Sequence, residues 1–219
     1  MQRFLLCCVM LGFVACSRAI PVGLRTSTSD NLDARASLAH AMQSMLAAKS
    51  YRARAESTTS NGTTSTSKIE FVAPDHFHLT RESSTPGHAA IKQETIVIGD
   101  ESWIKMGDAP WQKFPANPGE AIRQFRNPDV INEIAKSIDV KIVGTEVVDG
   151  TQTTIYQYTL GRPDNKDFST NAKTWVAADG LPRKTESEGD LTLGNKQIHT
   201  KSIITYYDYE ADIKIEKPV

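Results

Sequence analysis

The sequence has three cysteines in 219 residues, and none of them lies beyond residue 16. Cys7, Cys8 and Cys16 lie within or directly after the only long apolar run, residues 4–15. Cleavage before Cys16 would leave one cysteine, so the mature chain has no internal disulfide. A chain of this length buries roughly 70% of its unfolded surface and can form one domain around a hydrophobic core alone.

An excess of charge of one sign is also lacking. The chain has 25 Lys and Arg against 26 Asp and Glu, a net charge of −1, and both signs are spread along its length. A protein that binds DNA or RNA would show a basic face or stripe. The composition therefore predicts no nucleic-acid partner.

Catalytic and metal-binding motifs are absent as well. The sequence contains no Gly-x-Ser-x-Gly, no His-Glu-x-x-His and no glycine-rich phosphate loop. His76 and His78 share one side of a predicted strand, but the alternation places Phe77 and Leu79 on the buried face and no third ligand follows. We predict a protein that is not an enzyme and has neither a metal nor a cofactor.

The N-terminus has the pattern of an export signal. Arg3 precedes the apolar run, which is too short to span a bilayer as a helix. The run ends at Phe13-Val14-Ala15-Cys16, which resembles the lipobox of bacterial lipoproteins, in which the cysteine is lipidated and becomes the new N-terminus. We predict a signal peptide over residues 1–15 and a lipid on Cys16, which would anchor the protein in the cell envelope, facing the periplasm.

Other processing routes stay open. Ser17-Arg18-Ala19 is a small-x-small signal, and cleavage after Ala19 would give a soluble periplasmic or secreted protein. An uncleaved anchor is the third route. If Cys16 is lipidated, Ser17 in place of Asp after the cysteine favours the outer over the inner membrane, by resemblance to enterobacterial lipoproteins.

The chain after the cysteine begins with a tether and a helix. Residues 16–31 are small and polar without a hydrophobic period, which is typical of a flexible linker. Leu32–Lys49 has apolar residues at spacings of three and four, and Asp30 can cap it. We expect this amphipathic helix to lay its apolar stripe on a sheet.

From Tyr51 onward the hydrophobic period becomes two, interrupted by residue pairs that favour tight hairpins. Such pairs are Asn61-Gly62, Asp149-Gly150, Asp179-Gly180 and Gly194-Asn195. The pattern predicts an antiparallel meander of about ten strands, mostly sequential: Tyr51–Thr58, Ser65–Val72, His76–Glu82, Ala89–Ile98, Glu101–Met106, Val140–Val148, Thr151–Leu160, Ala172–Ala178, Leu181–Leu193 and Lys196–Tyr209.

Two helices interrupt the meander. Asn117-Pro118-Gly119-Glu120 supplies a cap, a first-turn proline and a carboxylate, and predicts a short helix through Phe125. Asn127-Pro128-Asp129 repeats this capping pattern and predicts a second helix that extends to about Ile138. We expect an α+β fold, in which one strongly curved antiparallel sheet has all three helices on its concave face, because a twisted sheet of this many strands tends to curl.

Several segments, taken in order, resemble LolA/LolB-like proteins. They contain a Pro-Asp-x-Phe corner, a Gly-Asp hairpin and a Trp-x-Lys strand, followed by later strands of similar pattern: Ile69–Leu79, Ile98–Gly107, Trp111–Lys113, Val143–Gly150, Trp175–Arg183 and Ile204–Tyr209. The resemblance covers residues 32–218. It implies that residues 32–219 form an unclosed β-barrel whose helix-covered concave side holds a hydrophobic cavity for acyl chains.

Two functions are compatible with this reading. The first is a membrane-anchored, monomeric envelope lipoprotein that binds lipid or lipoprotein acyl chains. The alternative is an envelope scaffold or signalling protein with the same fold and a filled cavity. A connected apolar void would favour the first, and large side chains that meet in the half-barrel the second. Aromatic residues are the candidates for the cavity wall or rim, unless they pack in an ordinary core: Phe77, Trp103, Trp111, Tyr156 and Trp175.

Overall fold

The computed structural model describes residues 29–115, 118–162, 165–193 and 196–218. The predicted signal peptide, Cys16 and most of the predicted tether lie outside these ranges, as do the cap Asn117 and the turn Gly194-Asn195. No helix in the described part of the chain is long and apolar enough to cross a membrane.

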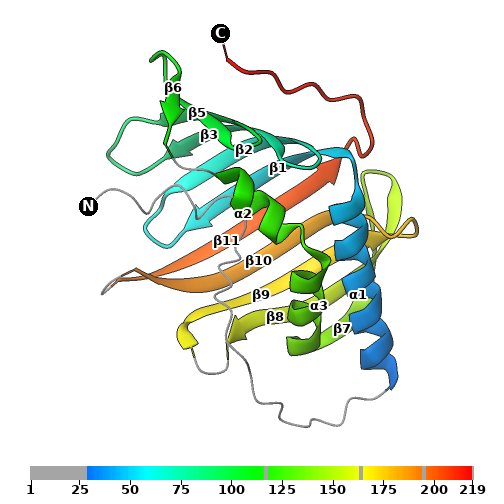
Figure 1. Ribbon diagram of the computed structural model, residues 1–219. Coiled ribbons are helices and arrows are strands. Elements are labelled where there is room, and N and C mark those ends of the chain that lie inside the picture. The colour runs from blue at the N-terminus through cyan, green and yellow to red at the C-terminus, as the bar shows by residue number, and fades with distance from the viewer. Residues whose placement is uncertain (1–28, 116–117, 163–164, 194–195, 219) are drawn as a thin grey trace.

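One antiparallel sheet of eleven strands forms the body of the protein, and it does not close into a barrel (Figure 1). The predicted fold class is confirmed, with one strand more than the period of two predicts. This strand, β6, is too short to show that period, and it overlaps the Trp-x-Lys segment of the resemblance. The strands are β1 (Ser50–Thr59), β2 (Thr64–Val72), β3 (His76–Ser84), β4 (Ile91–Ile98), β5 (Glu101–Met106), β6 (Gln112–Phe114), β7 (Val140–Val148), β8 (Thr151–Arg162), β9 (Asn165–Ala177), β10 (Pro182–Leu193) and β11 (Lys196–Tyr207).

Three of the predicted hairpin turns are confirmed. Asn61-Gly62 joins β1 to β2, Asp149-Gly150 joins β7 to β8, and Asp179-Gly180 lies between β9 and β10. Asp149 and Gly150 have φ values of 47° and 78°. This left-handed pair is the backbone of a type I′ turn, which matches the twist of the strands it connects.

The strand order is β6-β5-β4-β3-β2-β1-β11-β10-β9-β8-β7. Two sequential meanders, β1–β6 and β7–β11, are therefore joined where the first strand pairs with the last, from Arg52 opposite Tyr207 to Thr59 opposite Thr200. Because β6 and β7 lie at opposite edges, the chain between them has to cross from one side of the sheet to the other. It does so over the concave face.

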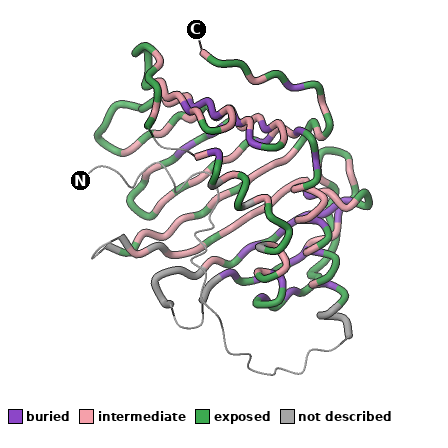
Figure 2. Tube along the Cα trace, in the orientation of Figure 1, coloured by how far each residue is buried: buried purple, intermediate pink, exposed green. Residues whose placement is uncertain are grey.

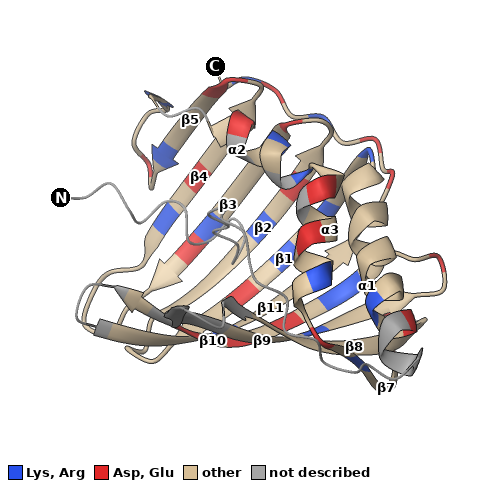
Figure 3. Ribbon diagram, turned by 60° about the horizontal axis from the view of Figure 1, so that its bottom comes forward, with Lys and Arg blue, Asp and Glu red and all other residues tan. Residues whose placement is uncertain are grey.

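Three helices cover this face: α1 (Ser29–Ala47), α2 (Pro118–Phe125) and α3 (Pro128–Ser137) (Figures 1 and 3). The expected placement of all three helices is thus confirmed. The Asn127 side chain accepts a hydrogen bond of 3.0 Å from the Asp129 amide and caps α3 as predicted. Helix α1 begins at Ser29, so Asp30 lies inside its first turn and is not its cap.

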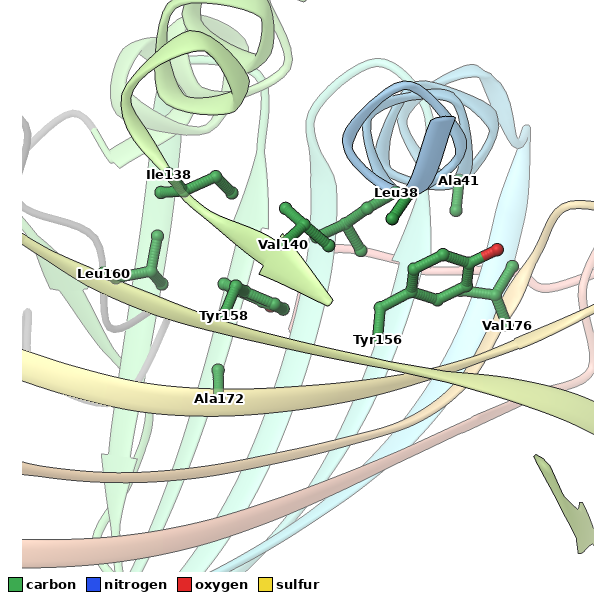
Figure 4. Packing of buried hydrophobic residues seen from close by; sticks show 10 residues of the cluster. Leu38, Ala41, Ile138, Val140, Tyr156, Tyr158, Leu160, Ala172 and Val176 are labelled. Atoms are coloured by element: carbon green, nitrogen blue, oxygen red, sulfur yellow. The ribbon is translucent and has the colours of Figure 1, made fainter. Parts of the chain in front are cut away.

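Buried residues form two clusters beneath the helices (Figure 2). In the first, Leu38 and Ala41 of α1 pack on Val140, Tyr156 and Tyr158 from β7 and β8 (Figure 4). The second joins β2, β3 and β4 to α2, through Phe71, Phe77, Leu79, Val97 and the partly buried Ile122.

The C-terminal strap, residues 208–218, runs back along one end of the sheet (Figure 1). The Ser50 hydroxyl donates to the Ala211 carbonyl at 2.6 Å, and the side chain of Ile213 is buried. Lys217 donates to Glu101, and its Nζ lies 5.5 Å from the centroid of the Trp103 ring. The strap thereby connects β1, in the middle of the sheet, to β5 near its edge.

Truncation of Leu38 should cost much of the stability of the fold. The side chain is 1% exposed where α1 meets the sheet, and a buried Leu→Ala change costs about 2–5 kcal/mol through lost burial and a cavity. We expect this loss for Leu38→Ala in urea unfolding. Ala36→Ser, at an exposed position of the same helix, should stay within about 0.5 kcal/mol of wild type; equal effects would contradict the packing.

Acid should release the strap. Hydrogen bonds from Lys113 and Lys217 lower the pKa of Glu101 from 4.5 to about 2. Since the pKa falls on folding, the contact stabilises the fold above pH 4.5 and is lost as the pH falls through about 2. In a chain that keeps only Trp103 as tryptophan, fluorescence should change with a midpoint near this pH.

Glu101→Gln should abolish this fluorescence transition, because the amide cannot titrate. The control is Glu133→Gln, which removes an exposed carboxylate of α3 that pairs with Lys136 and should leave the transition in place. A transition that persists in Glu101→Gln would show that another group controls the strap.

Candidate functional site

The concave face of β1–β5 can be read from the strand register, because residues opposite one another in an antiparallel pair project to the same face. Tyr51, Phe71, Phe77 and Val97 are in register across β1–β4. The last three of these residues belong to the cluster that contains Ile122 of α2. This row therefore faces the helices, and every second residue from it along each strand faces the same way.

Three such rows cross the five strands and a fourth crosses β1–β4, and the rows differ in chemistry. The two rows nearest α2 are mostly apolar and are called the apolar rows: Tyr51, Phe71, Phe77, Val97 and Ser102, then Ala53, Ile69, Leu79, Thr95 and Ile104. The next two are called the polar rows: Ala55, Ser67, Arg81, Gln93 and Met106, then Ser57, Ser65, Ser83 and Ile91. The face is thus amphipathic along the strand direction.

Arg126, between α2 and α3, covers the first apolar row. Its guanidinium lies 4.3 Å from the centroid of the Phe71 ring and donates to the carbonyls of Leu46 and Ala48 at the end of α1. Tyr51 stacks on Phe71 with the centroids 5.1 Å apart, and burial raises the pKa of Tyr51 to about 12. Burial also lowers the pKa of Arg126. Both residues are partly buried.

Helix α2 is fixed to the hairpins at this end of the sheet. Arg123 donates to Asp75 at 2.6 Å and to Asp100 at 2.8 Å. A Cβ on Gly119 would lie 1.9 Å from the Gly99 carbonyl oxygen, so only glycine allows this approach. The Pro-Asp corner and the Gly-Asp hairpin of the sequence motifs therefore meet at one arginine. Sequence reasoning missed Arg123, because a single arginine in a short helix is usually solvated.

The sheet surface beneath α1 differs from the concave face of β1–β5, because its polar side chains form hydrogen bonds with one another. The Tyr158 hydroxyl is 3.0 Å from that of Thr174, which is 3.2 Å from that of Thr185. Tyr206 is hydrogen-bonded to Thr185, and burial raises its pKa. The large side chains of Leu38 and Tyr158 belong to the buried cluster in this half of the concave side.

A cavity of about 360 Å³ lies at the far end of this half, between α1 and the ends of β8 and β9. Its lining is part polar and part apolar, and it includes Tyr156 from the predicted set: Ser37, His40, Gln152, Thr153, Thr154, Tyr156, Val176, Ala177, Ala178 and Gly180. The volume is within the range of small-molecule sites, but the lining is more polar than an acyl chain requires.

The structure separates the five predicted aromatic residues. Phe77 is in the first apolar row and Tyr156 is in the cluster under α1, so these two face the helices but belong to different clusters. Trp103 and Trp175 lie one residue from concave positions, next to Ser102 and Thr174, and therefore project from the opposite face.

Each tryptophan on the outer face has a cation nearby. Lys184 Nζ lies 4.3 Å from the centroid of the Trp175 ring, whose Nε1 donates to Glu146 at 2.6 Å. Trp111 lies beside Lys105, 5.9 Å from its ring centroid. Strand alternation directs Trp103 and Trp175 away from the concave face, and Trp111, which precedes β6, lies beside Lys105 of the outer face.

The outer, convex face carries rows of paired charges; both signs occur along β1–β4 in Figure 3. Arg52 donates to Glu70 at 2.8 Å, and His78 lies between Glu70, at 3.2 Å, and Glu94, at 2.8 Å. The described residues contain no group of His, Cys, Asp and Glu that could hold a metal ion. The charges of this face bind one another across the strands.

No known protein-family model matches the chain, and no curated protein matches it. Solved structures are similar in fold. LprF from Mycobacterium bovis is 12% identical with a TM-score of 0.57, over 87% of this chain and 99% of that one. A DUF1329 family protein from Desulfovibrio piger is 12% identical with a TM-score of 0.35, over 86% and 96%.

A LolA superfamily protein from Nitrosomonas europaea is 12% identical with a TM-score of 0.26, over 83% of this chain and 94% of that one. At these identities the similarity concerns the fold alone. Of these three structures LprF supports it, because its TM-score is above 0.5. The unclosed, helix-covered half-barrel that the LolA/LolB-like resemblance implied is confirmed as the fold of this chain.

Proposed function

We propose that this protein is a membrane-anchored lipoprotein of the bacterial envelope that binds lipid, or the acyl chains of lipoproteins, on its concave face without catalysis. The observation that supports this best is the pair of apolar rows across β1–β5, which lie under α2 and face the interior of an unclosed barrel. Of the predicted cavity residues, Phe77 belongs to this surface.

Apolar side chains also occur at the outer rim of the same face. Ile91 is 55% exposed and Met106 is 45% exposed, and both are on concave positions of β4 and β5. Burial of an acyl chain contributes about 0.8 kcal/mol per methylene. A chain that extends from this rim to Phe77 and Leu79 would gain such contacts along its length.

The second candidate is a scaffold or signalling protein of the envelope that acts through its surface. The packed cluster under α1 favours it, since Leu38, Tyr156 and Tyr158 meet there. We therefore place the lipid over β1–β5 rather than in the middle of the half-barrel. Lipid that co-purifies from membranes, detected by native mass spectrometry, distinguishes the two.

Membrane attachment is proposed to occur through Cys16. Two or more acyl chains on one residue make release from a bilayer slow, whereas a single chain does not. The protein would then act as a fixed receptor or binder rather than as a soluble carrier.

A bulky side chain on the concave face should block binding. Ala55 lies on this face, where β1 passes from the apolar to the polar rows, so Ala55→Trp would displace part of a bound chain. Loss of two methylene contacts, about 0.8 kcal/mol each, weakens binding about tenfold. A fluorescent fatty acid measures the effect.

Arg54→Trp is the matched control, since it adds the same side chain at the next residue but on the convex face. It should bind as wild type does, and both variants should unfold near the wild-type temperature. No lipid in the membrane-purified protein, together with no fatty-acid binding by wild type, would sink the lipid-binding function.

Removal of the Cys16 thiol should release the protein from membranes. Cys16→Ser should move the protein from the membrane to the soluble fraction and abolish the mass of attached acyl chains. Cys8→Ser alters a cysteine inside the proposed signal peptide and should leave the mature protein membrane-bound. A Cys16→Ser protein that is processed normally and stays on the membrane would contradict lipidation.

A further inference from the structure

A cavity of about 360 Å³ between α1 and the ends of β8 and β9 plays no part in the lipid binding proposed above. The acyl surface is on β1–β5, whereas this cavity lies in the other half of the concave side, next to the cluster packed under α1. An acyl chain on the apolar rows would leave it unfilled. Its volume is at the lower end of the range of small-molecule sites, which fits a small ligand.

Polar side chains from the sheet and from α1 line this cavity. Gln152, Thr154 and Tyr156 alternate along β8, so all three project to the face beneath α1. Ser37 and His40 are three residues apart on α1, which places them on one side of the helix. The cavity therefore has hydrogen-bonding groups on two walls.

The side chains of these five residues make no hydrogen bond within the described ranges of the chain. Neighbouring polar groups of the same half differ. Thr153 donates to the Glu146 carbonyl at 2.7 Å, and the Tyr158 hydroxyl is hydrogen-bonded to that of Thr174. Since these neighbours are satisfied by the protein itself, the five side chains at the cavity stand out, and their hydrogen-bonding capacity is left for water or a ligand.

The part of the lining formed by described residues contains no Lys, Arg, Asp or Glu. Asp179, in the adjoining turn, pairs with Arg183 of β10. A ligand carboxylate or phosphate would find no Lys or Arg in this lining, and a ligand ammonium group would find no carboxylate. Hydroxyls, amides and the neutral imidazole ring instead carry both donors and acceptors. They match a ligand whose own groups are hydroxyls.

The cavity also has an apolar wall. Tyr156, Val176 and Ala177 are buried residues of β8 and β9. Thr154 is in register with Val176, so both project to the same face. In Figure 4 the Tyr156 ring lies next to Val176, and its hydroxyl points toward α1. A sugar ring has a matching division, with apolar C–H faces that can pack on such side chains and a rim of hydroxyls that can bond to polar ones.

We propose that this cavity binds a small neutral molecule with several hydroxyl groups, either a free sugar or the terminal sugar of a glycan. Its hydroxyls bond to Ser37 and His40 of α1 and to the polar side chains of β8. One face of its ring packs on Tyr156. The inference does not depend on lipid binding, because it concerns other strands and another ligand.

The test compares neutral and charged probes of similar size. Methyl β-D-glucopyranoside should bind wild type with a dissociation constant in the millimolar range, measured from the shift of the His40 imidazole resonances in NMR titrations. D-glucuronate adds a charge that finds no partner, and cyclohexanol has a single hydroxyl, so each should bind about fivefold or more weakly. Maltose distinguishes the two sources. An affinity at least equal to that of the glucoside indicates the end of a glycan, and a lower affinity indicates a free sugar.

Gln152→Ala should weaken binding of the glucoside about fivefold, because one hydrogen-bonding side chain is lost from the wall. Gln157→Ala is the matched control, since it removes the same exposed side chain from the opposite face of the same strand. It should bind as wild type does. Thr154→Val removes a hydroxyl with little change of shape and should also weaken binding, while its unfolding temperature stays near that of wild type.

Any of the following results would overturn the sugar site. The His40 resonances do not shift with either neutral sugar, glucuronate or cyclohexanol binds as tightly as the glucoside, or Gln152→Ala and Gln157→Ala weaken binding alike. In each case lipid binding on β1–β5 would stand, because its test uses other ligands and other residues.

Discussion

The pairing of β1 with β11 is the contact on which the rest of the architecture depends. It joins two sequential meanders into one sheet and places the first and last strands of the chain side by side in its middle. As a result, β6 and β7 become the outer edges, and the segment between them has to cross the sheet. Helices α2 and α3 lie on that segment, so the connection itself covers part of the concave face, and α1 covers another part.

Alternation along the strands then divides the chemistry between two faces. Ion pairs such as Arg52 with Glu70 are in water on the convex side, where each pair contributes little because solvent screens it. The concave side of β1–β5 has Ser, Thr, aliphatic and aromatic residues and Arg81.

Local features of this fold were predictable, and distant contacts were not. The alternation at His76–Leu79 correctly gave Phe77 and Leu79 the buried side, and Asn127 before a proline gave the start of α3. The same alternation, continued for two residues along β3, places Arg81 on the same face as Phe77 and Leu79. The pairing of β1 with β11 leaves no local mark, because any two amphipathic strands can pair. Trp103 and Trp175 were assigned to the cavity by residue type, although their strand positions direct them outward.

An unclosed barrel keeps two edges, and these are unequal. β6 offers three residues, whereas β7 presents nine, with Ile142, Val143 and Val147 about half exposed. Free strand edges are templates for another strand, which makes β7 the segment of the described sheet most prone to aggregation. The register shift between Ile142 and Gly144 interrupts this edge. A bulge there lets the sheet stay open at β7 without offering a continuous strand to a second molecule.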